Sequence, residues 1–361
     1  SKNPIAPNQI VETIIVITKG GSVARIGFIS KESALSRDLI FLNTSKLKIF
    51  DRKFIFFYLI SDFTNKLILK TASLTAQPHL TIKLMRDLPI FFPSENFRKR
   101  ISELFDDSYS KLQTSKSLYK EAEEILLKEM NLENYKPKHE LTFSSNLKEV
   151  LEAERIDADY FQPKYKEIEK KIEKFENITL ADKESFKIIT GVYSQKYSDK
   201  GTEYIRSVDI QNNLFVNPED LYKTEETLDN RIKVKEGDIV TSRVGSIGSL
   251  GYINKEIEGS FISDNILRIR NLNKNLNSLF LAFYLKQIGT IFMERLSRGS
   301  VQQRLNQETL KEIKIPLLPP TIQEKISSKI QESFKLRKES KELLEKAKRM
   351  VEDEIEKEAR K

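Results

Sequence analysis

Two stretches decide the fold: Gly245-Ser-Ile-Gly-Ser-Leu-Gly-Tyr-Ile253 and its near copy Gly21-Ser-Val-Ala-Arg-Ile-Gly-Phe-Ile29, which lies 224 positions earlier. The register persists well beyond these nine residues. Asp38 corresponds to Asp264, Tyr58 and Leu59 to Tyr284 and Leu285, and Gln77 to Gln303, each 226 positions apart; Leu88, Ile90 and Ile101 correspond to Ile313, Ile315 and Ile326 at 225. A repeat of this length indicates two related domains rather than a stack of short units.

Each copy carries the pattern of a small α/β domain. In the first copy, β-branched runs and apolar spacing predict strands over 13–17, 28–29, 39–42 and 88–92 and a helix over 54–69. In the second copy, strands are expected over 203–210 and 237–245. Residues 140–230 have no counterpart upstream of Val11, so the first domain contains only the later half of the module.

Each copy then runs into a long charged helix. From Glu95 to Asn131, after the N-cap residue Ser94, small or apolar residues recur at Phe97, Ile101, Phe105, Ser108, Leu112, Ser115, Tyr119, Ala122 and Leu126. From Thr321 onward they recur at Ile322, Ile326, Ile330, Phe334, Leu344, Ala347, Val351 and Ile355. Such three- and four-residue steps are typical of a coiled-coil seam, so we expect the two helices to pair antiparallel.

The predicted fold class is therefore α+β, with two α/β domains, the first incomplete, separated by two long helices that form an antiparallel coiled coil. The expected boundaries are 1–93 for the first domain, 94–135 for the first helix, 136–320 for the second domain and 321–361 for the second helix.

Composition limits the class of protein. The chain has no cysteine, which excludes disulfides and thiolate metal sites and indicates a cytoplasmic location. No apolar run reaches the roughly 18 residues that span a bilayer, so we expect no membrane association. The net charge of +8 and pI near 9.2 favour a polyanionic partner. Because the chain begins at Ser1 rather than Met, we expect an incomplete N-terminus.

The sequence offers no catalytic set. It has only two histidines, His79 and His139, and no zinc or phosphate-binding loop motif. We therefore expect a protein without enzymatic activity, catalytic residues or a metal site.

Turns and strand ends of the second domain instead concentrate side chains that bind base edges, because Arg pairs with guanine, Gln with adenine and Ser with either. The predicted DNA-binding residues are Tyr193, Gln195, Lys196, Tyr197, Arg206, Ser207, Arg243, Ser246, Arg298, Ser300, Gln302, Gln303 and Arg304 in the second domain, and Lys19, Ser22, Arg25, Thr75 and Gln77 in the first.

Five segments resemble the specificity subunits of type I restriction-modification systems. They are Gly299-Ser-Val-Gln-Gln-Arg304, residues 310–315, Pro316-Leu-Leu-Pro-Pro-Thr-Ile-Gln-Glu-Lys-Ile326 at the start of a long helix, Arg155-Ile-Asp-Ala-Asp-Tyr-Phe161 and Tyr204-Ile-Arg-Ser-Val-Asp-Ile210. The resemblance implies a DNA-binding subunit whose two target recognition domains each recognise one half of a split DNA site, while the helices set their separation.

The resemblance also implies partners. Two methyltransferase subunits would dock on the helices, for which we name Ile101, Phe105, Leu112, Ile326, Ile330 and Leu344, and endonuclease-translocase subunits would join them. S-adenosylmethionine, ATP and Mg²⁺ would be bound by those partners, and DNA methylation would occur there. This chain has none of the Asn-Pro-Pro-Tyr or Asp-Pro-Pro-Tyr sequences that resemble an adenine methyltransferase site.

Two alternatives stay open. The chain could be the recognition part of a fused type IIG restriction-methylation enzyme, or a scaffold whose coiled coil joins two protein-binding modules. The first domain departs from the family pattern because it lacks its leading half and because Pro89-Ile-Phe-Phe-Pro93 lacks the Gln-Glu that follows Pro320. Either the chain is truncated, or another polypeptide or a larger fused enzyme supplies the missing half.

Overall fold

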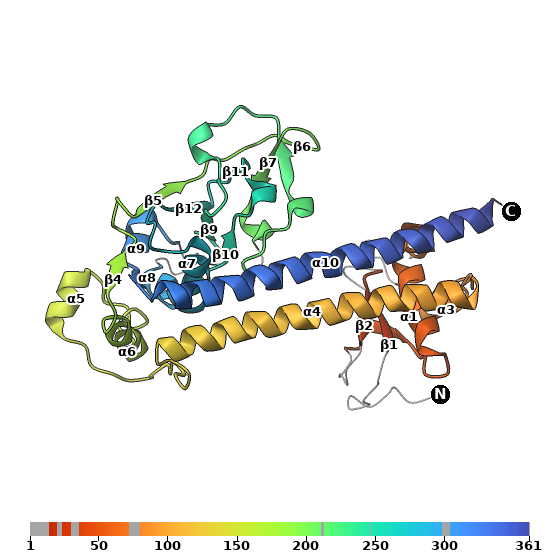
Figure 1. Cartoon of the computed structure of the whole chain (residues 1–361), viewed down its shortest axis with the longest axis horizontal. Helices are drawn as coiled ribbons and strands as arrows, with labels where there is room; N and C mark the ends of the chain where they lie inside the picture. Colours follow the sequence, from red (N-terminus) through yellow and green to blue (C-terminus); the bar gives the residue numbers. More distant parts are fainter. Residues whose placement is uncertain are drawn as a thin grey trace. The chain divides into compact units, whose positions relative to one another are not determined.

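The computed structural model describes residues 14–19, 24–29, 36–71, 80–210, 213–245, 247–297 and 304–360. The chain separates into two compact units (Figure 1). The first unit consists of Ser1–Lys116 and Lys335–Lys361, and the second of Ser117–Phe334. Each unit holds one α/β module and one stretch of each long helix, so the predicted mixture of helices and strands in two domains is confirmed.

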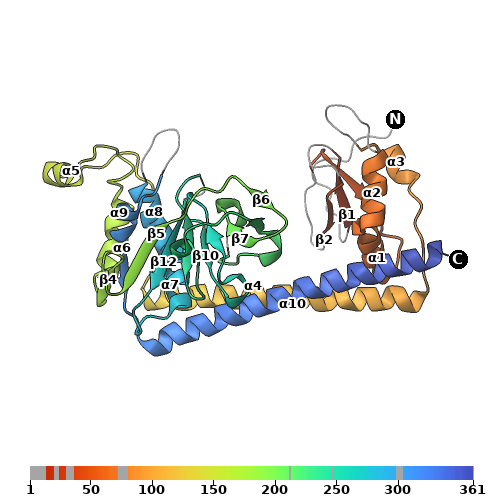
Figure 2. The same cartoon turned by 90° about the horizontal axis from the view of Figure 1, so that it is seen from above.

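The first module is a three-stranded antiparallel sheet with helices. Its elements are β1 (Ile14–Thr18), β2 (Ile26–Ile29), β3 (Leu39–Leu42), α1 (Ile49–Ile60), α2 (Asp62–Thr71) and α3 (Ile82–Arg86). The strand order is β2-β1-β3, with β1 in the centre. Figure 2 shows α1, α2 and α3 grouped with β1 and β2. Side chains of β1 and α1 form its core, in which Ile15, Ile17 and Phe57 are fully buried.

Two predictions for this module were wrong. The single helix over 54–69 is interrupted at Ser61, whose backbone is extended and whose Oγ donates to the Tyr58 carbonyl at 2.7 Å. Residues 88–92 form no strand. Their counterpart in the second unit, β13 (Lys314–Pro316), pairs with β4 (Asn177–Thr179). The described part of the first unit has no counterpart of β4, and a strand needs a partner for its backbone hydrogen bonds.

The second module is larger. Its further strands are β5 (Phe186–Thr190), β6 (Tyr197–Ser198), β7 (Thr202–Ile205), β8 (Tyr222–Thr224), β9 (Ile239–Ser242), β10 (Leu250–Tyr252), β11 (Phe261–Ile262) and β12 (Ile266–Asn271). Its helices are α5 (Leu147–Ala153), α6 (Pro163–Ile172), α7 (Ser278–Tyr284), the π-helical turn η5 (Leu285–Gly289), α8 (Thr290–Leu296) and α9 (Gln307–Lys311), and its 3₁₀ turns are η1 (Ser207–Asp209), η2 (Pro218–Asp220), η3 (Asn230–Ile232) and η4 (Lys255–Ile257).

The central sheet of the second module, in the order β10-β9-β12-β5, has a separate core on each face. Leu267 and Ile269 of β12 belong to the core that includes α7 and α8, whereas Ile266 belongs to the core that includes the second sheet, β11-β7-β8-β6. Alternation along a strand places neighbouring side chains on opposite faces. In Figure 2 the central sheet lies between α8 and α9 on one side and β6 and β7 on the other.

The repeat detected in the sequence is present in the structure. The order β2-β1-β3 of the first module matches β10-β9-β12 of the second. The Tyr58 hydroxyl donates to the carbonyl of Pro89 at 3.0 Å, and that of its counterpart Tyr284 donates to the carbonyl of Lys314 at 2.8 Å. Burial raises the pKa of Tyr284, which keeps its hydroxyl protonated as a donor. The same buried side chain therefore makes the same backbone bond in both modules.

The predicted antiparallel pairing of the long helices, α4 (Glu95–Glu129) and α10 (Pro320–Ala359), is confirmed within each unit. In the first unit the Ser340 hydroxyl donates to the Ser108 carbonyl at 2.8 Å, and the Ser108 hydroxyl contacts Ser340 in return. In the second unit Lys329 forms an ion pair with Glu121 at 2.6 Å. Small buried residues recur every seven positions along this seam: Ser108, Ser115 and Ala122 on α4, and Ser333, Ser340 and Ala347 on α10.

Candidate nucleic-acid interface

The loop after β5 is fixed to the sheet by its backbone. A Cβ atom on Gly191 would lie 2.2 Å from the carbonyl oxygen of Ile262, so only glycine fits there. The next residue, Val192, donates its N–H to the same carbonyl at 3.1 Å. The buried Tyr204 of β7 donates its hydroxyl to the Val192 carbonyl at 2.7 Å and accepts the Ser194 N–H at 3.2 Å. These contacts hold the backbone of the loop in one place.

The side chains of this loop face solvent. Tyr193 is 60% exposed and Tyr197 is 46% exposed, and Gln195 and Lys196 are also exposed. The ring of Tyr197 meets that of Tyr222 edge to face, with 5.6 Å between centroids, and Tyr222 is itself about half exposed. Exposed aromatic groups beside polar side chains are typical of binding surfaces.

Arg206 follows β7 and lies beside this aromatic pair. Its guanidinium carbon is 4.0 Å from the centroid of the Tyr222 ring. Its Nη2 and Nε donate to the Asp209 carboxylate at 2.9 and 3.1 Å, and these bonds raise the pKa of Arg206. A guanidinium has five N–H donors, so up to three remain for another acceptor. Arg206 is thus a cation whose orientation is fixed and whose remaining N–H donors can bind another acceptor.

The prediction of one strand over 203–210 was wrong. Strand β7 ends at Ile205, and the chain turns through η1, where an oxygen of the Asp209 carboxylate accepts the Arg206 N–H at 2.8 Å. This turn places Val208 at the surface with 78% of it exposed, next to Ser207. Val208 was not among the predicted DNA-binding residues, because an apolar side chain in a half-buried strand is expected to face the core.

Backbone hydrogen bonds bring Ser207, Arg243 and Arg304 to the same end of the module. The carbonyl of Asn265, just before β12, accepts the Arg243 N–H at 3.0 Å and the Ser207 hydroxyl at 3.4 Å. Val244 forms a β-bridge with Arg304, which is exposed. The Nε of Arg243 is buried and has no hydrogen-bond partner among the described residues.

The first module repeats part of this arrangement. The Arg243 carbonyl accepts the Leu305 N–H at 2.9 Å, and the Lys19 carbonyl accepts the Leu80 N–H at the same distance. Lys19 is therefore the structural counterpart of Arg243. Arg25 is exposed, and its N–H donates to Thr18 Oγ1 at 3.0 Å.

The remaining predicted DNA-binding residues lie outside the described residues. They are Ser22, Thr75, Gln77, Ser246, Arg298, Ser300, Gln302 and Gln303. The structure thus brings together Tyr193, Gln195, Lys196, Tyr197, Arg206, Ser207, Arg243 and Arg304 at the strand ends of the second module, with Val208 and Tyr222 as additions. We call these ten residues the recognition face.

The residues predicted to bind partners pack inside the protein to different degrees. Ile101, Ile326 and Ile330 are fully buried, so they have no surface to offer a partner. Phe105, Leu112 and Leu344 are half-buried, and Phe105 packs edge to face on Phe28 with 4.8 Å between ring centroids. Partner docking on α4 and α10 stays a prediction.

Across the described ranges, no three His, Cys, Asp or Glu side chains are grouped as a metal site would require. In the same ranges, every helix is too short or too polar to cross a bilayer.

The chain matches a family model described as the type I restriction modification DNA specificity domain over residues 6–124 and 169–346. It is similar to the type I restriction-modification S subunit of M. genitalium, with 17% identity over 95% of this chain and 83% of that chain and a TM-score of 0.48. It is also similar to the HsdS subunit of Thermoanaerobacter tengcongensis, with 15% identity over 97% of this chain and 82% of that chain and a TM-score of 0.36. A structure of type I R-M complex assembly is similar as well, with 15% identity over 97% of this chain and 82% of that chain and a TM-score of 0.38.

Proposed function

The chain belongs to the family of type I restriction-modification DNA specificity domains, and from that premise we propose that it is the DNA-binding specificity subunit of such a system. In this proposal the chain selects the DNA sequence and performs no catalytic step itself. The observation that carries the proposal is the recognition face, where loops from four separate strands meet and present Arg, Gln, Tyr and Ser side chains.

The recognition face has the chemistry that binding to the major groove requires. Arg206 offers N–H donors from a guanidinium whose position is fixed by Asp209 and Tyr222. A bidentate Arg pairs with guanine O6 and N7, and Gln195 has the amide that pairs with adenine. Exposed Lys196 and Arg304 are suited to contact phosphates, which fix the position of a protein on DNA without reading its sequence.

We propose further that the two modules recognise two parts of one DNA site. The number of base pairs between those parts that neither module contacts would depend on the length of α4 and α10. The repeat supports this, because the shared half-module keeps the same strand order and the same backbone bonds in both units. Methyltransferase and endonuclease subunits would act on DNA that this chain selects, and would supply S-adenosylmethionine, ATP and Mg²⁺.

DNA selection tests the proposal directly. The full chain, alone and with its cognate methyltransferase subunit, is used to enrich DNA duplexes from a random pool. Its affinity for the most enriched duplex is then measured by fluorescence anisotropy at several salt concentrations. The proposal expects an enriched split motif and a log-log salt slope of about −0.9 for each phosphate neutralised. A scaffold protein would enrich no motif, and that result would reject the assignment.

A second test applies in cells. The methylome of cells that carry this gene with its partner genes should contain one methylated split motif that disappears when the gene is deleted. If the motif persists in the deletion strain, another chain supplies specificity. If the gene proves continuous with a methyltransferase, the chain is instead the recognition part of a fused enzyme.

A further inference from the structure

A second charged site lies at the opposite end of the central sheet from the recognition face. It is a cavity of about 340 Å³ beside β12 and the turn η3. Six residues with cationic side chains line it: Lys187, Arg231, Lys233, Lys235, Arg268 and Arg270. One carboxylate, Glu258, lines it as well. From Ile266, at the end of β12 that lies nearest the recognition face, to Arg270 the strand rises about 13 Å, so the two sites are separate.

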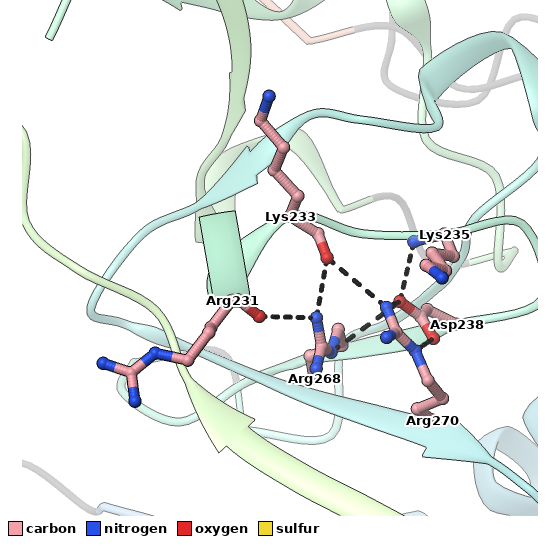
Figure 3. Close-up of polar contacts among 6 residues, drawn as sticks. All are labelled: Arg231, Lys233, Lys235, Asp238, Arg268 and Arg270. Atoms are coloured by element: carbon pink, nitrogen blue, oxygen red, sulfur yellow. Dashed lines mark hydrogen bonds and ion pairs between the residues drawn. The ribbon is translucent and has the colours of Figure 1, made fainter. Parts of the chain in front are cut away.

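Two arginines share one buried carboxylate in the wall of this cavity (Figure 3). Arg270 donates from Nε and Nη2 to the two oxygens of Asp238, each at 2.7 Å. Arg268 donates from Nη1 to the carbonyls of Arg231 and Lys233 at 3.0 and 2.7 Å. Asp238 is therefore already satisfied by Arg270, and Arg268 is held mainly by backbone oxygens.

The charge of Arg268 is only partly neutralised. It is 1% exposed, its Nε lies 3.7 Å from Asp238 Oδ2, and that Nε has no hydrogen-bond partner among the described residues. A buried cation without full compensation is unfavourable. An anion in the cavity beside it would supply the missing charge.

The outer wall adds like charges. Lys187 of β5 lies directly opposite Arg270 of β12 in the register of the two strands. Like charges at directly opposite positions destabilise a sheet. Lys235 is exposed at the rim, and its backbone N–H donates to Asp238 at 2.8 Å. The six cations carry six positive charges, and the carboxylates of Asp238, Glu258 and Asp229 offset three of them. Asp229 does so by pairing with Arg231. A net of three positive charges remains.

We propose that this cavity binds a phosphate group. The phosphate could belong to the DNA backbone outside the bases that the recognition face contacts, or to a free phosphate-bearing molecule. The chemistry is the same in both cases, because guanidinium and ammonium groups around a concave surface favour a compact, multiply charged oxyanion.

The test uses the full chain and leaves the buried arginines intact. The variant is Lys187→Gln with Lys235→Gln, and the control is Lys174→Gln with Lys183→Gln, which makes the same charge change at exposed positions of the same unit. Unfolding midpoints are measured in sodium phosphate and in sodium chloride of equal ionic strength. Wild type and control should gain about 3 °C in phosphate, and the cavity variant should lose this gain.

A second arm identifies the source of the phosphate. The salt dependence of DNA binding is measured for the same three proteins. If the site takes a backbone phosphate, the log-log slope of the cavity variant falls by about 0.9 for each phosphate that it no longer neutralises, and the control keeps its slope. An unchanged slope together with an absent phosphate response assigns the site to a free molecule. If the cavity variant and the control respond equally to phosphate, the proposal is wrong. The phosphate arm does not require DNA binding, so it remains informative even if the proposed function fails.

Discussion

Replacing Arg206 should change the DNA sequence that the chain selects while leaving its fold intact. The guanidinium is held by Asp209 and lies against Tyr222, so its remaining donors point from a fixed position. In Arg206→Ala these donors disappear. In Arg206→Lys the positive charge stays, but an ammonium cannot form a planar bidentate contact or stack on the ring.

The expected magnitudes separate recognition from stability. One good bidentate contact to a base contributes about 1–3 kcal/mol of discrimination, which corresponds to a factor of about 5 to 150 in affinity. The Asp209 side chain is 5% exposed, but its carboxylate also accepts the backbone N–H of residue 206, which both variants keep, so losing the side-chain contact should cost about 1 kcal/mol of stability. Both variants should therefore stay folded while their affinity for the preferred sequence falls.

The assay combines DNA selection with anisotropy on the enriched duplex and on a scrambled one. Arg206→Ala and Arg206→Lys should bind the enriched duplex about 5- to 150-fold more weakly, with relaxed preference at one base pair. Lys174→Ala is the control, because it removes one exposed positive charge from the same unit. If either Arg206 variant selects the wild-type motif with wild-type affinity, or if both duplexes weaken equally, Arg206 does not contact a base.

Three other predictions follow from single contacts. Val208→Ala removes an apolar group that is 78% exposed, so the free energy of unfolding should stay within about 0.5 kcal/mol of the wild-type value. The base preference at one position of the selected motif should weaken, and an unchanged motif would contradict this. Ser108→Leu places a larger group in the buried seam opposite Ser340 and should destabilise the first unit by about 1–3 kcal/mol in urea unfolding, whereas Ser110→Leu on the exposed face should not. Tyr284→Phe removes a buried hydrogen bond at 2.8 Å and should lower stability by about 1–2 kcal/mol, and an unaltered urea midpoint would count against that role.

Features set by local sequence periods could be predicted. The heptad recurrence that includes Ser108, Ser115 and Ala122 identified the buried seam of α4, because side chains on one helical face depend only on their spacing. The correspondence of Tyr58 with Tyr284 identified the duplicated module, because both tyrosines serve the same backbone bond. In each case the prediction depended only on the spacing of residues along the chain.

Features that depend on a distant partner could not be predicted. Residues 88–92 have the same apolar character as the strand Lys314–Pro316, yet only the latter has β4 beside it. Residues 203–210 have a strand-like composition, but the Asp209 carboxylate accepts the Arg206 N–H and turns the chain. A side chain that competes for backbone hydrogen bonds can end a strand without any change in hydrophobic pattern.

The same distinction explains which parts of the recognition face the repeat shares. Lys19 and Arg243 occupy equivalent positions because both follow the central strand of the duplicated sheet and accept the same backbone bond. Arg206, Val208 and Tyr193 lie in the segment of the second module that has no counterpart upstream of Val11. Among the described residues, the duplicated half therefore contributes Arg243 and Arg304 to the recognition face, and the unduplicated half contributes the other eight.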